Sequence, residues 1–176
     1  MNKKTKFRYL FFLVLIILIL IIILYLQKKV ILFEIKKYPS GDTVICEVVQ
    51  PGEIIKTSYR HSVATTTVWE IYEVIENYKL IQRETHFYDS IAGMPYAAFG
   101  DEIFIMEDGK CKIKNMNRVI PLPLNYNIGA IRENYLYLKN NKINLSELTG
   151  DMLVTINLRK VNQLQIFKMD WCSDNF

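Results

Sequence analysis

The sequence predicts an all-β sandwich or open barrel preceded by one N-terminal transmembrane helix. One apolar run near the N-terminus is long enough to cross a bilayer. After it, strand-like segments recur about every ten residues with turn residues between them. No long segment beyond this leader has the 3.6-residue period of an amphipathic helix. We therefore expect residues 1–29 to form a cytoplasmic tip and membrane anchor, and residues 30–176 to form an extracytoplasmic all-β domain.

Length and charge also separate a leader from one folded domain. The chain has 176 residues, which is enough for one domain with a hydrophobic core. Residues 1–37 hold eight Lys or Arg and one Glu, whereas residues 38–176 hold fourteen Lys or Arg and seventeen Asp or Glu. The net charge of +4 therefore belongs to the leader. Since the domain itself is slightly acidic, it has no electrostatic basis for binding nucleic acid.

The leader has the composition of a membrane-spanning helix. Residues 10–26 are seventeen consecutive apolar residues, and counting from Phe7 gives twenty, with Arg8 near the end where it can snorkel. A span of ~20 residues crosses ~30 Å of hydrocarbon. Because the run is apolar on every side, it has no amphipathic face to lie on a membrane or to pack on a domain. We expect residues 7–26 to contact the lipid bilayer.

The residues that flank the run predict its orientation. Four basic residues and no acidic one precede it within the first eight positions, and Lys28 and Lys29 follow it. The positive-inside rule favours a cytoplasmic N-terminus, which makes this a single-pass protein of the cell membrane with its C-terminal domain outside the cytoplasm. The alternative is a cleavable signal peptide, which has a shorter apolar core and small residues at its cleavage site. Residues 27–30, Gln-Lys-Lys-Val, contain no Ala or Gly and favour an uncleaved anchor.

The domain reads as a series of short strands rich in β-branched and aromatic residues. Expected strands are residues 30–37, 43–49, 53–58, 67–76, 78–88, 102–106, 111–114, 135–138, 143–148 and 152–158. Residues 38–42, Tyr-Pro-Ser-Gly-Asp, and Asp108-Gly109 provide turn chemistry. Two prolines make residues 118–124 an edge or irregular segment, and residues 125–131 are ambiguous. We expect the tail to end in a strand through Leu164, Ile166 and Phe167.

Two further features concern the loops and the cysteines. Residues 89–101 form the longest stretch of the domain without strand periodicity, and loops of this length are often functional. Cys46, Cys111 and Cys172 are not spaced like a zinc or redox pair, and we expect no cofactor and no metal. Outside the cytoplasm they allow one disulfide and one free thiol, with the pairing left open. Alternatively, they are small buried apolar side chains.

The stretch from Ser58 to Glu70 concentrates chemically capable side chains, including one of the two histidines. Strand alternation turns Ile55, Thr57, Tyr59 and His61 inward and Ile54, Lys56, Ser58 and Arg60 to the opposite face. Across the turn, Val68, Glu70, Tyr72 and Val74 share a face. If the two strands pair, Glu70 lies opposite Tyr59 or His61. An inward carboxylate and imidazole are expected to pair, which would raise the pKa of His61.

Three interpretations of this stretch are open. In the first, Tyr59, His61 and Glu70 form a structural polar cluster, because buried polar groups are normally hydrogen-bonded. In the second, the stretch is a ligand or partner site, where Arg60 binds a carboxylate or phosphate. In the third, His61 and Glu70 are the acid–base pair of a small envelope hydrolase or transferase. In a strand the side chains of His61 and Ser62 point to opposite faces, which does not favour a serine nucleophile activated by this histidine. The sequence also has no Gly-x-Ser-x-Gly turn that would present a nucleophile.

Binding is the function that we expect from these alternatives, and we expect no enzyme activity. A purely structural envelope protein is a further alternative. The second histidine, His86, shares a strand face with Glu84, but two histidines and scattered carboxylates are a weak basis for a metal site.

Motifs in this region are similar to a known family. They are Tyr-Arg-His-Ser-Val at 59–63, Val68 and Glu70, then Glu84-Thr85-x-Phe87-x-x-Ser90 and Ala92-Gly93-Met94-Pro95. In this order and spacing they resemble the family called domain of unknown function 1850, over roughly residues 45–155. The chain departs from the family pattern at Ala64, where a Glu is usual, and at Ile91, where a Gly is usual.

The resemblance implies a role beside a transporter. Members of the family are small proteins often encoded next to tripartite (TRAP) transporters of the TAXI type, which implies help with solute uptake and contact with a transporter membrane subunit or a solute receptor. Carried over to this chain, the family pattern marks His61, Ser62, Glu70, Gly93 and Pro95. Tyr59 and Arg60, which directly follow the expected strand 53–58, are added to these positions. The candidate site residues are therefore Tyr59, Arg60, His61, Ser62, Glu70, Gly93 and Pro95.

Overall fold

The structure is a computed structural model that describes residues 3–62, 65–88 and 97–167. Its chain forms two compact units. One combines Met1–Val30 with Lys160–Phe176, and the other is Ile31–Arg159. The second unit carries the strands that position the candidate site.

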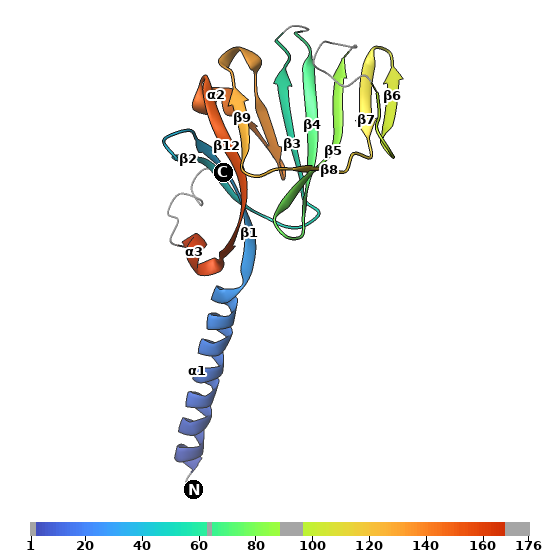
Figure 1. The fold of residues 1–176 in the computed structure, drawn as a ribbon. Helices are drawn as coiled ribbons and strands as arrows, with labels where there is room; N and C mark the ends of the chain where they lie inside the picture. The colour runs from blue at the N-terminus through green and yellow to red at the C-terminus, as the bar shows by residue number, and fades with distance from the viewer. Residues whose placement is uncertain (1–2, 63–64, 89–96, 168–176) are drawn as a thin grey trace. The chain divides into compact units, whose positions relative to one another are not determined.

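The N-terminal helix α1 extends over Lys3–Gln27 (Figure 1). Its apolar part, Phe7–Gln27, has 21 residues and is long and apolar enough to cross a membrane. The side chains from Phe7 to Tyr25 are all exposed, although nearly all of them are apolar. A helix that exposes apolar side chains on every side is stable in lipid and unfavourable in water. The predicted N-terminal helix is therefore confirmed as an apolar helix that could span a membrane.

The tail of the first unit differs from its prediction as a strand. Residues Gln163–Phe167 form the short helix α3. Asn162 and Gln165 cap its start reciprocally, because each backbone N–H donates to the other's side-chain oxygen, at 2.9 and 2.8 Å. This capping box is a helix-start signal that outweighs the apolar pattern of Leu164, Ile166 and Phe167.

Strands make up most of the second unit. They are β1 (Lys29–Lys37), β2 (Thr43–Val49), β3 (Ile54–Arg60), β4 (Thr67–Ile75), β5 (Lys79–Tyr88), β6 (Ile103–Glu107), β7 (Lys110–Lys114), β8 (Arg118–Ile120), β9 (Leu124–Ile128), β10 (Tyr135–Leu138), β11 (Asn141–Asn144) and β12 (Met152–Asn162). The 3-10 turn η1 (Ala130–Arg132) and the helix α2 (Leu145–Thr149) interrupt them.

Most of the predicted strands are confirmed, and one is wrong in its second half. Residues 143–148 were expected to form a strand, but β11 ends at Asn144 and α2 begins at Leu145. The Asn144 side chain accepts a 3.2 Å hydrogen bond from the Glu147 N–H, which starts a helix as an N-cap. The ambiguous residues 125–131 divide between β9 and η1.

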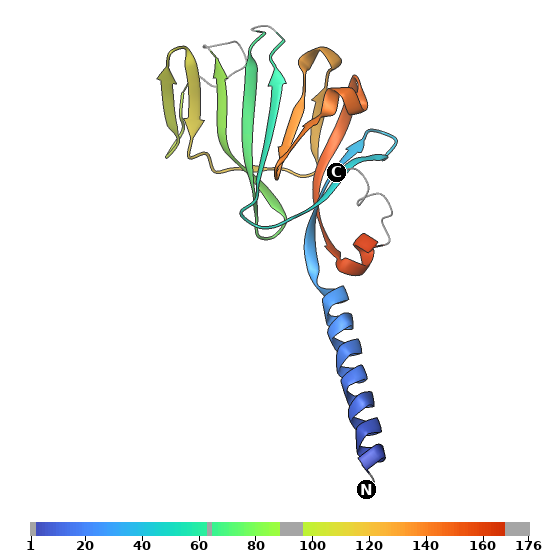
Figure 2. The same ribbon diagram turned by 180° about the vertical axis from the view of Figure 1, so that it is seen from behind.

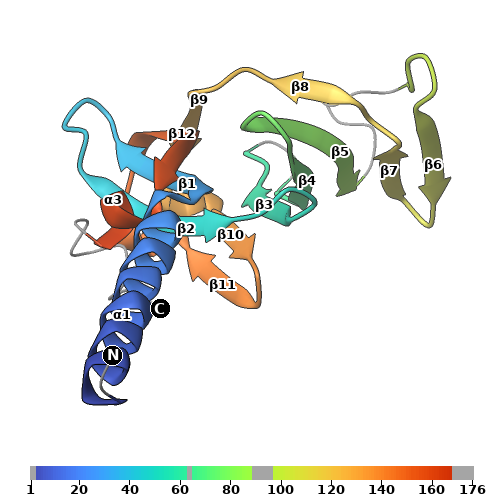
Figure 3. The same cartoon turned by 90° about the horizontal axis from the view of Figure 1, so that it is seen from below.

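Within the described residues, the strands form two sheets (Figures 1 and 2). The small sheet has the order β2-β1-β12-β9. The large sheet has the order β11-β10-β3-β4-β5-β7-β6, and β8 pairs with β5 beside this path. Figure 3 shows the chain passing from β8, at the large sheet, to β9 in the small sheet. The predicted all-β sandwich or open barrel is therefore confirmed as two antiparallel sheets.

The main core lies between these sheets. Buried side chains from both contribute to it, including Phe33, Ile55, Val74, Leu136 and Ile156. A second cluster, which contains Val68, Phe87 and Ile113, covers the inner face of β4, β5 and β7. At ~25 cal/mol per Å², burial of apolar surface between the two sheets is the main favourable term in folding. The polar side chains between the two clusters form the candidate site.

Candidate functional site

The pairing of β3 with β4 places the predicted site residues. Thr57 lies opposite Glu70, and Tyr59 lies opposite Val68. The inward direction of Thr57, Tyr59 and Glu70 is confirmed, because directly paired residues share a face of the sheet. The expectation that Glu70 lies opposite Tyr59 or His61 is wrong. His61 instead meets Thr66 across the turn, where its backbone N–H donates 2.8 Å to the Thr66 carbonyl.

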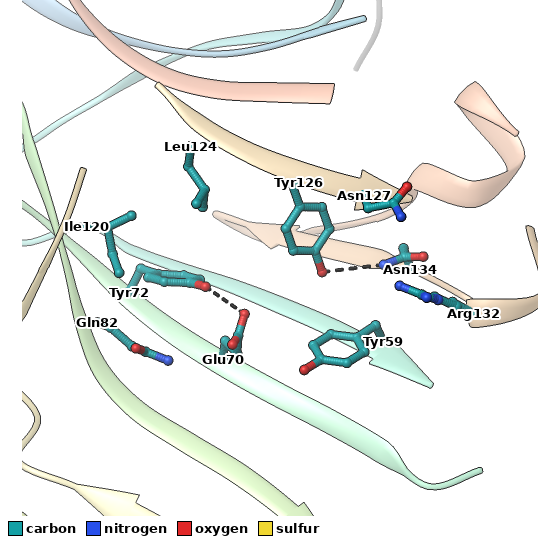
Figure 4. Close-up of a pocket in the computed structure, with 10 residues that line it drawn as sticks. All are labelled: Tyr59, Glu70, Tyr72, Gln82, Ile120, Leu124, Tyr126, Asn127, Arg132 and Asn134. Carbon is teal, nitrogen blue, oxygen red and sulfur yellow. Dashed lines mark hydrogen bonds between the residues drawn. The ribbon is translucent and has the colours of Figure 1, made fainter. Parts of the chain in front are cut away.

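The inward side chains line a pocket of about 400 Å³ between the two sheets (Figure 4). The large sheet contributes Tyr59, Glu70, Tyr72 and Gln82. Ile120, from β8, also belongs to this sheet. The opposite wall is formed by Leu124, Tyr126, Asn127, Arg132 and Asn134. A volume of this size lies in the range of small-ligand sites, and a few polar groups on an apolar wall are typical of them.

The floor of the pocket is a cluster of oxygen atoms. The Tyr72 hydroxyl donates a 2.6 Å hydrogen bond to Oε2 of the half-buried Glu70 (Figure 4). Thr57 is 2% exposed, and within the described part of the chain its hydroxyl makes no hydrogen bond of normal geometry. The hydroxyls of Tyr72 and Tyr126 are its polar neighbours. Thr57 itself does not line the pocket, so its buried hydroxyl is not available to a solute there.

Burial controls the charge state of these groups. Desolvation raises the pKa of Glu70 and outweighs the hydrogen bond from Tyr72, which lowers it. Burial, with the negative charge of Glu70, raises the pKa of Tyr59 to about 12. The pKa values of Tyr72 and Tyr126 are raised mainly by burial as well. The tyrosines therefore remain neutral donors and acceptors, and Glu70 is a carboxyl group that is easily protonated.

Arg132 supplies the positive charge of the pocket. Its charge lowers the pKa of both Tyr59 and Tyr126, which places it within electrostatic reach of their hydroxyls. It ends the turn η1, whose following residue, Glu133, has a left-handed backbone with φ of 49°. Gly129 leaves room for the arginine stem, because a Cβ at this glycine would lie 3.0 Å from Cγ of Arg132.

Asn134 fixes this wall. It is 1% exposed, and its Oδ1 accepts a 3.1 Å hydrogen bond from the Gly129 N–H. Its own N–H donates to Ser146 Oγ at 2.8 Å, and Ser146 Oγ donates to the Gly129 carbonyl at 2.9 Å. Its Nδ2 reaches the Tyr126 hydroxyl at 3.4 Å (Figure 4). The buried amide therefore connects η1, β9 and α2 and orients the arginine and the tyrosine together.

Among the predicted site residues that the structure describes, only Tyr59 and Glu70 come together in the pocket. Arg60 is exposed, donates from Nε to the Thr65 carbonyl at 3.1 Å and lies 3.9 Å from Glu133. Ser62 is exposed and His61 is half-buried, and neither lines the pocket. Gly93, Pro95 and most of the predicted 89–101 loop lie outside the described residues.

Six polar or aromatic lining residues were not predicted as site residues: Tyr72, Gln82, Tyr126, Asn127, Arg132 and Asn134. Tyr72 carried a signal, because it shares a strand face with Glu70. Arg132 and Asn134 carried none, since they lie in a stretch without clear periodicity and reach the pocket only through the packing of β9 on the large sheet.

The second histidine lies on the outer face of the large sheet. As expected, His86 shares a face with Glu84, and its Nε2 lies 2.7 Å from Glu84 Oε2. Trp69 pairs with His86 across β4 and β5, so this imidazole is separated from the pocket by the sheet itself.

Cysteine placement agrees in part with the sequence. Cys46 is disulfide-bonded, and Cys111 is buried in the second core cluster. Cys172 lies outside the described residues.

Comparison with known proteins gives one match. No curated protein and no solved structure matches the chain. The profile of the family described as Domain of unknown function (DUF1850) matches residues 55–145, which is just over half of the chain. The matched range extends from β3 to the start of α2 and includes every residue that lines the pocket. The chain therefore belongs to the family Domain of unknown function (DUF1850).

Proposed function

We propose that the protein is a membrane-anchored, extracytoplasmic binding protein that holds a small polar solute in the pocket between its sheets. The observation that carries the proposal is the half-buried carboxyl of Glu70, which faces three tyrosine rings and Arg132 in the same pocket. Partly buried ionisable groups with raised pKa values, gathered in a cavity, are typical of functional sites.

The chemistry of the walls favours a small carboxylic acid that also carries hydroxyl or amino groups. Arg132 provides a guanidinium for the carboxylate, since its planar fork matches two carboxylate oxygens. Glu70 and the hydroxyls of Tyr59 and Tyr126 provide acceptors and donors for the polar remainder. Ile120 and Leu124 contact its carbon atoms.

Two features support the location. The apolar surface of α1 fits a helix that stays in the bilayer, and the basic residues before it favour a cytoplasmic N-terminus. The disulfide at Cys46 fits a domain outside the cytoplasm, because disulfides persist in oxidising compartments.

The family resemblance supports a more specific role beside a TAXI-type TRAP transporter. An anchored domain that binds a solute reversibly would raise the local concentration of that solute beside a transporter membrane subunit or a solute receptor. This role needs binding without turnover. Glu70 pairs with Thr57, and His61 follows Thr57 by four residues, or ~13 Å along an extended chain. The two groups that an acid–base mechanism would have used are therefore separated.

The test is binding by the full-length protein in detergent micelles. Thermal unfolding is measured with succinate, glutamate, malate and glycerol, and calorimetry follows for any solute that raises the Tm. We expect a hydroxylated or amino acid to stabilise the wild type, and Arg132→Gln to weaken its binding about tenfold. The control Arg83→Gln removes an arginine that pairs with Glu73 at 2.7 Å and does not line the pocket. Equal weakening by both variants, or no binding of any carboxylic acid, contradicts the proposal.

The transporter role has its own test. The anchored protein is cross-linked in its native membrane and purified through a C-terminal tag. Recovery of a TRAP membrane subunit or solute receptor supports the role, and recovery of neither contradicts it while leaving solute binding unaffected.

A further inference from the structure

The outer face of the large sheet carries a band of aromatic and basic side chains that is separate from the pocket. We call it the aromatic–basic face and define it by Lys56, Trp69, Lys112, Tyr135, Tyr137 and Lys142. These side chains come from β3, β4, β7, β10 and β11, which are neighbours across the sheet with β5 between β4 and β7. Strand pairing brings them together, since they are far apart in the sequence.

Two rows of paired residues build this face. In one row Lys142 pairs with Tyr137, Tyr137 with Lys56, and Lys56 with Ile71. In the other, Ser58 lies between Tyr135 and Trp69. Ser58 is 2% exposed although it points outward, because the two large rings beside it cover it.

The second row continues to the far strands. Trp69 pairs with His86, and His86 pairs with Lys112. The second row therefore crosses five strands from β10 to β7, a width of ~19 Å at the usual spacing of strands.

Ammonium groups lie directly over the rings. Lys56 Nζ is 3.9 Å from the centre of the Trp69 ring and 5.4 Å from that of Tyr137. Lys142 Nζ is 4.1 Å from the centre of the Tyr135 ring. The Trp69 and Tyr137 rings are 5.4 Å apart and tilted by 45°. Cations over rings stabilise one another, so these side chains form a connected cluster on the sheet.

A shallow hollow of about 200 Å³ adjoins the rings. It is bordered on this face by Trp69, His86, Tyr88, Lys110 and Lys112. Within the two rows and this hollow, Glu84 is the one carboxylate among the described residues, and it is bonded to His86. Four lysines thus surround the rings on a domain that is acidic as a whole, so the charge is concentrated here.

We propose that the aromatic–basic face binds an anionic polysaccharide of the cell envelope. The exposed parts of these half-buried rings offer apolar contact to the C–H groups of sugars, and the lysines over them offer point charges to carboxylates or phosphates. The width of the band fits an extended chain of several sugar units better than a single small molecule. A bilayer surface is less suited, because membrane-binding surfaces insert projecting apolar side chains, whereas these rings are half-buried and covered by lysines.

The probe is polygalacturonate, with dextran as the neutral control, added to the full-length protein in detergent micelles. The chain has two tryptophans, so a Trp171→Phe background leaves Trp69 as the reporter of its own surroundings. We expect polygalacturonate to change Trp69 fluorescence, with an affinity that falls as salt rises, and dextran to have no effect. Replacing two lysines, Lys56→Gln with Lys112→Gln, is expected to weaken binding about tenfold.

Two control variants keep the test specific. Lys79→Gln removes an exposed lysine far from Trp69, because it pairs with Ile75, six residues further along β4. The affinity for polygalacturonate is expected to change by no more than about twofold. Glu70→Gln alters the pocket on the other face, and unchanged polysaccharide binding separates this proposal from solute binding.

Three results would overturn the inference. They are equal binding of dextran, unaltered affinity in the double lysine variant, and binding of vesicles of phosphatidylcholine with phosphatidylglycerol in place of the polysaccharide. The double variant also loses the contact of Lys56 with the Trp69 ring, so its Tm is measured in parallel and is expected to fall by only a few degrees.

Discussion

The Tyr72 hydroxyl donates a 2.6 Å hydrogen bond to Glu70, two residues earlier on the same inward face of β4. This pair, and not a pair of His61 with Glu70, is the polar centre of the domain. It determines how a carboxyl group is held in a half-buried pocket, and it gives the first two predictions.

Removing the donor tests the pair directly. Tyr72→Phe leaves the ring in place but deprives Glu70 of its hydrogen bond, so we expect a loss of about 1–3 kcal/mol in the free energy of unfolding at neutral pH. The matched control is Tyr126→Phe, which loses a 3.4 Å contact with Asn134 and an interaction with the Thr57 hydroxyl but no bond to a carboxyl group, and it should cost less than about 1 kcal/mol. Urea unfolding of the full-length protein in detergent measures both. Similar losses in the two variants would show that the bond to Glu70 has no special importance.

Glu70 itself predicts a pH dependence with a definite sign. Burial raises its pKa in the folded protein above the ordinary value of 4.5, so the folded state keeps a proton that the unfolded chain has lost. Its contribution to stability is complete below the unfolded pKa and is lost as pH rises through the folded pKa. Glu70→Gln cannot ionise, so the variant should gain stability relative to wild type as pH rises.

Unfolding of wild type and Glu70→Gln between pH 4 and 8 checks this difference. Glu73→Gln serves as the control, because Glu73 is on the same strand but pairs with Arg83 at 2.7 Å. It should lose rather than gain stability relative to wild type at neutral pH. If the wild type instead becomes more stable relative to Glu70→Gln as pH rises, the expected direction of the pH dependence is contradicted.

Glu102 should show the opposite pH dependence. Arg118 donates to its two carboxylate oxygens at 2.7 and 2.8 Å, and these hydrogen bonds lower the pKa of Glu102. Such a group stabilises the fold above its unfolded pKa, and the stability is lost as pH falls through the folded pKa. Since Arg118 is 40% exposed, Glu102→Gln should cost only about 1 kcal/mol at pH 7.

The cost of Glu102→Gln should disappear in acid, which unfolding below pH 4 measures. Glu76→Gln, at an exposed carboxylate beside the β4–β5 turn, should leave stability within about 0.5 kcal/mol at either pH. A difference between Glu102→Gln and wild type that grows in acid would refute the assignment.

The anchor can be tested with one charge. Ile17→Arg places a charge in the middle of the apolar run, at a cost of about 3 kcal/mol for insertion. We expect a smaller fraction of this variant to resist extraction by alkaline carbonate. Ile131→Arg, at a side chain that is 87% exposed in η1, is the control and should extract like wild type. Release of a shortened wild-type protein from the membrane would indicate a cleaved signal peptide instead.

The disulfide at Cys46 predicts a thiol count. Of three cysteines, one thiol should react with a maleimide reagent after denaturation of the protein isolated without reductant, and three should react after reduction. Cys46→Ser should lower the free energy of unfolding by about 2–5 kcal/mol under oxidising conditions. Under reducing conditions wild type and variant should be nearly equally stable. Three reactive thiols before reduction would contradict both the disulfide and an oxidising location.

Local patterns in the sequence were sufficient for most of the fold. The apolar run of α1 and the alternation in β2, β4 and β5 depend on residues within one element, and each was predicted close to its observed bounds. The inward direction of Tyr59 and Glu70 also followed from alternation. Two errors, at α2 and α3, have a local cause as well. Asn144 and Asn162 cap short helices, and that signal was outweighed by apolar residues after them.

The candidate site depended on register and on sheet packing. Alternation determines the face on which Glu70 lies, but not the residue opposite it, because shifting a strand by two residues preserves the same alternation. The length of the β3–β4 turn sets that register and puts Thr57 opposite Glu70. Arg132, Tyr126 and Asn134 reach the pocket because β9 joins the small sheet and packs over the large one.

The sequence by itself therefore determined an apolar helix that could span a membrane, an all-β domain and the faces of its strands. Only the tertiary structure decided which side chains share a site. The physical reason is that hydrophobic periodicity is a property of neighbouring residues, whereas a pocket joins residues from strands that are distant in the chain and meet only when two sheets bury a common core.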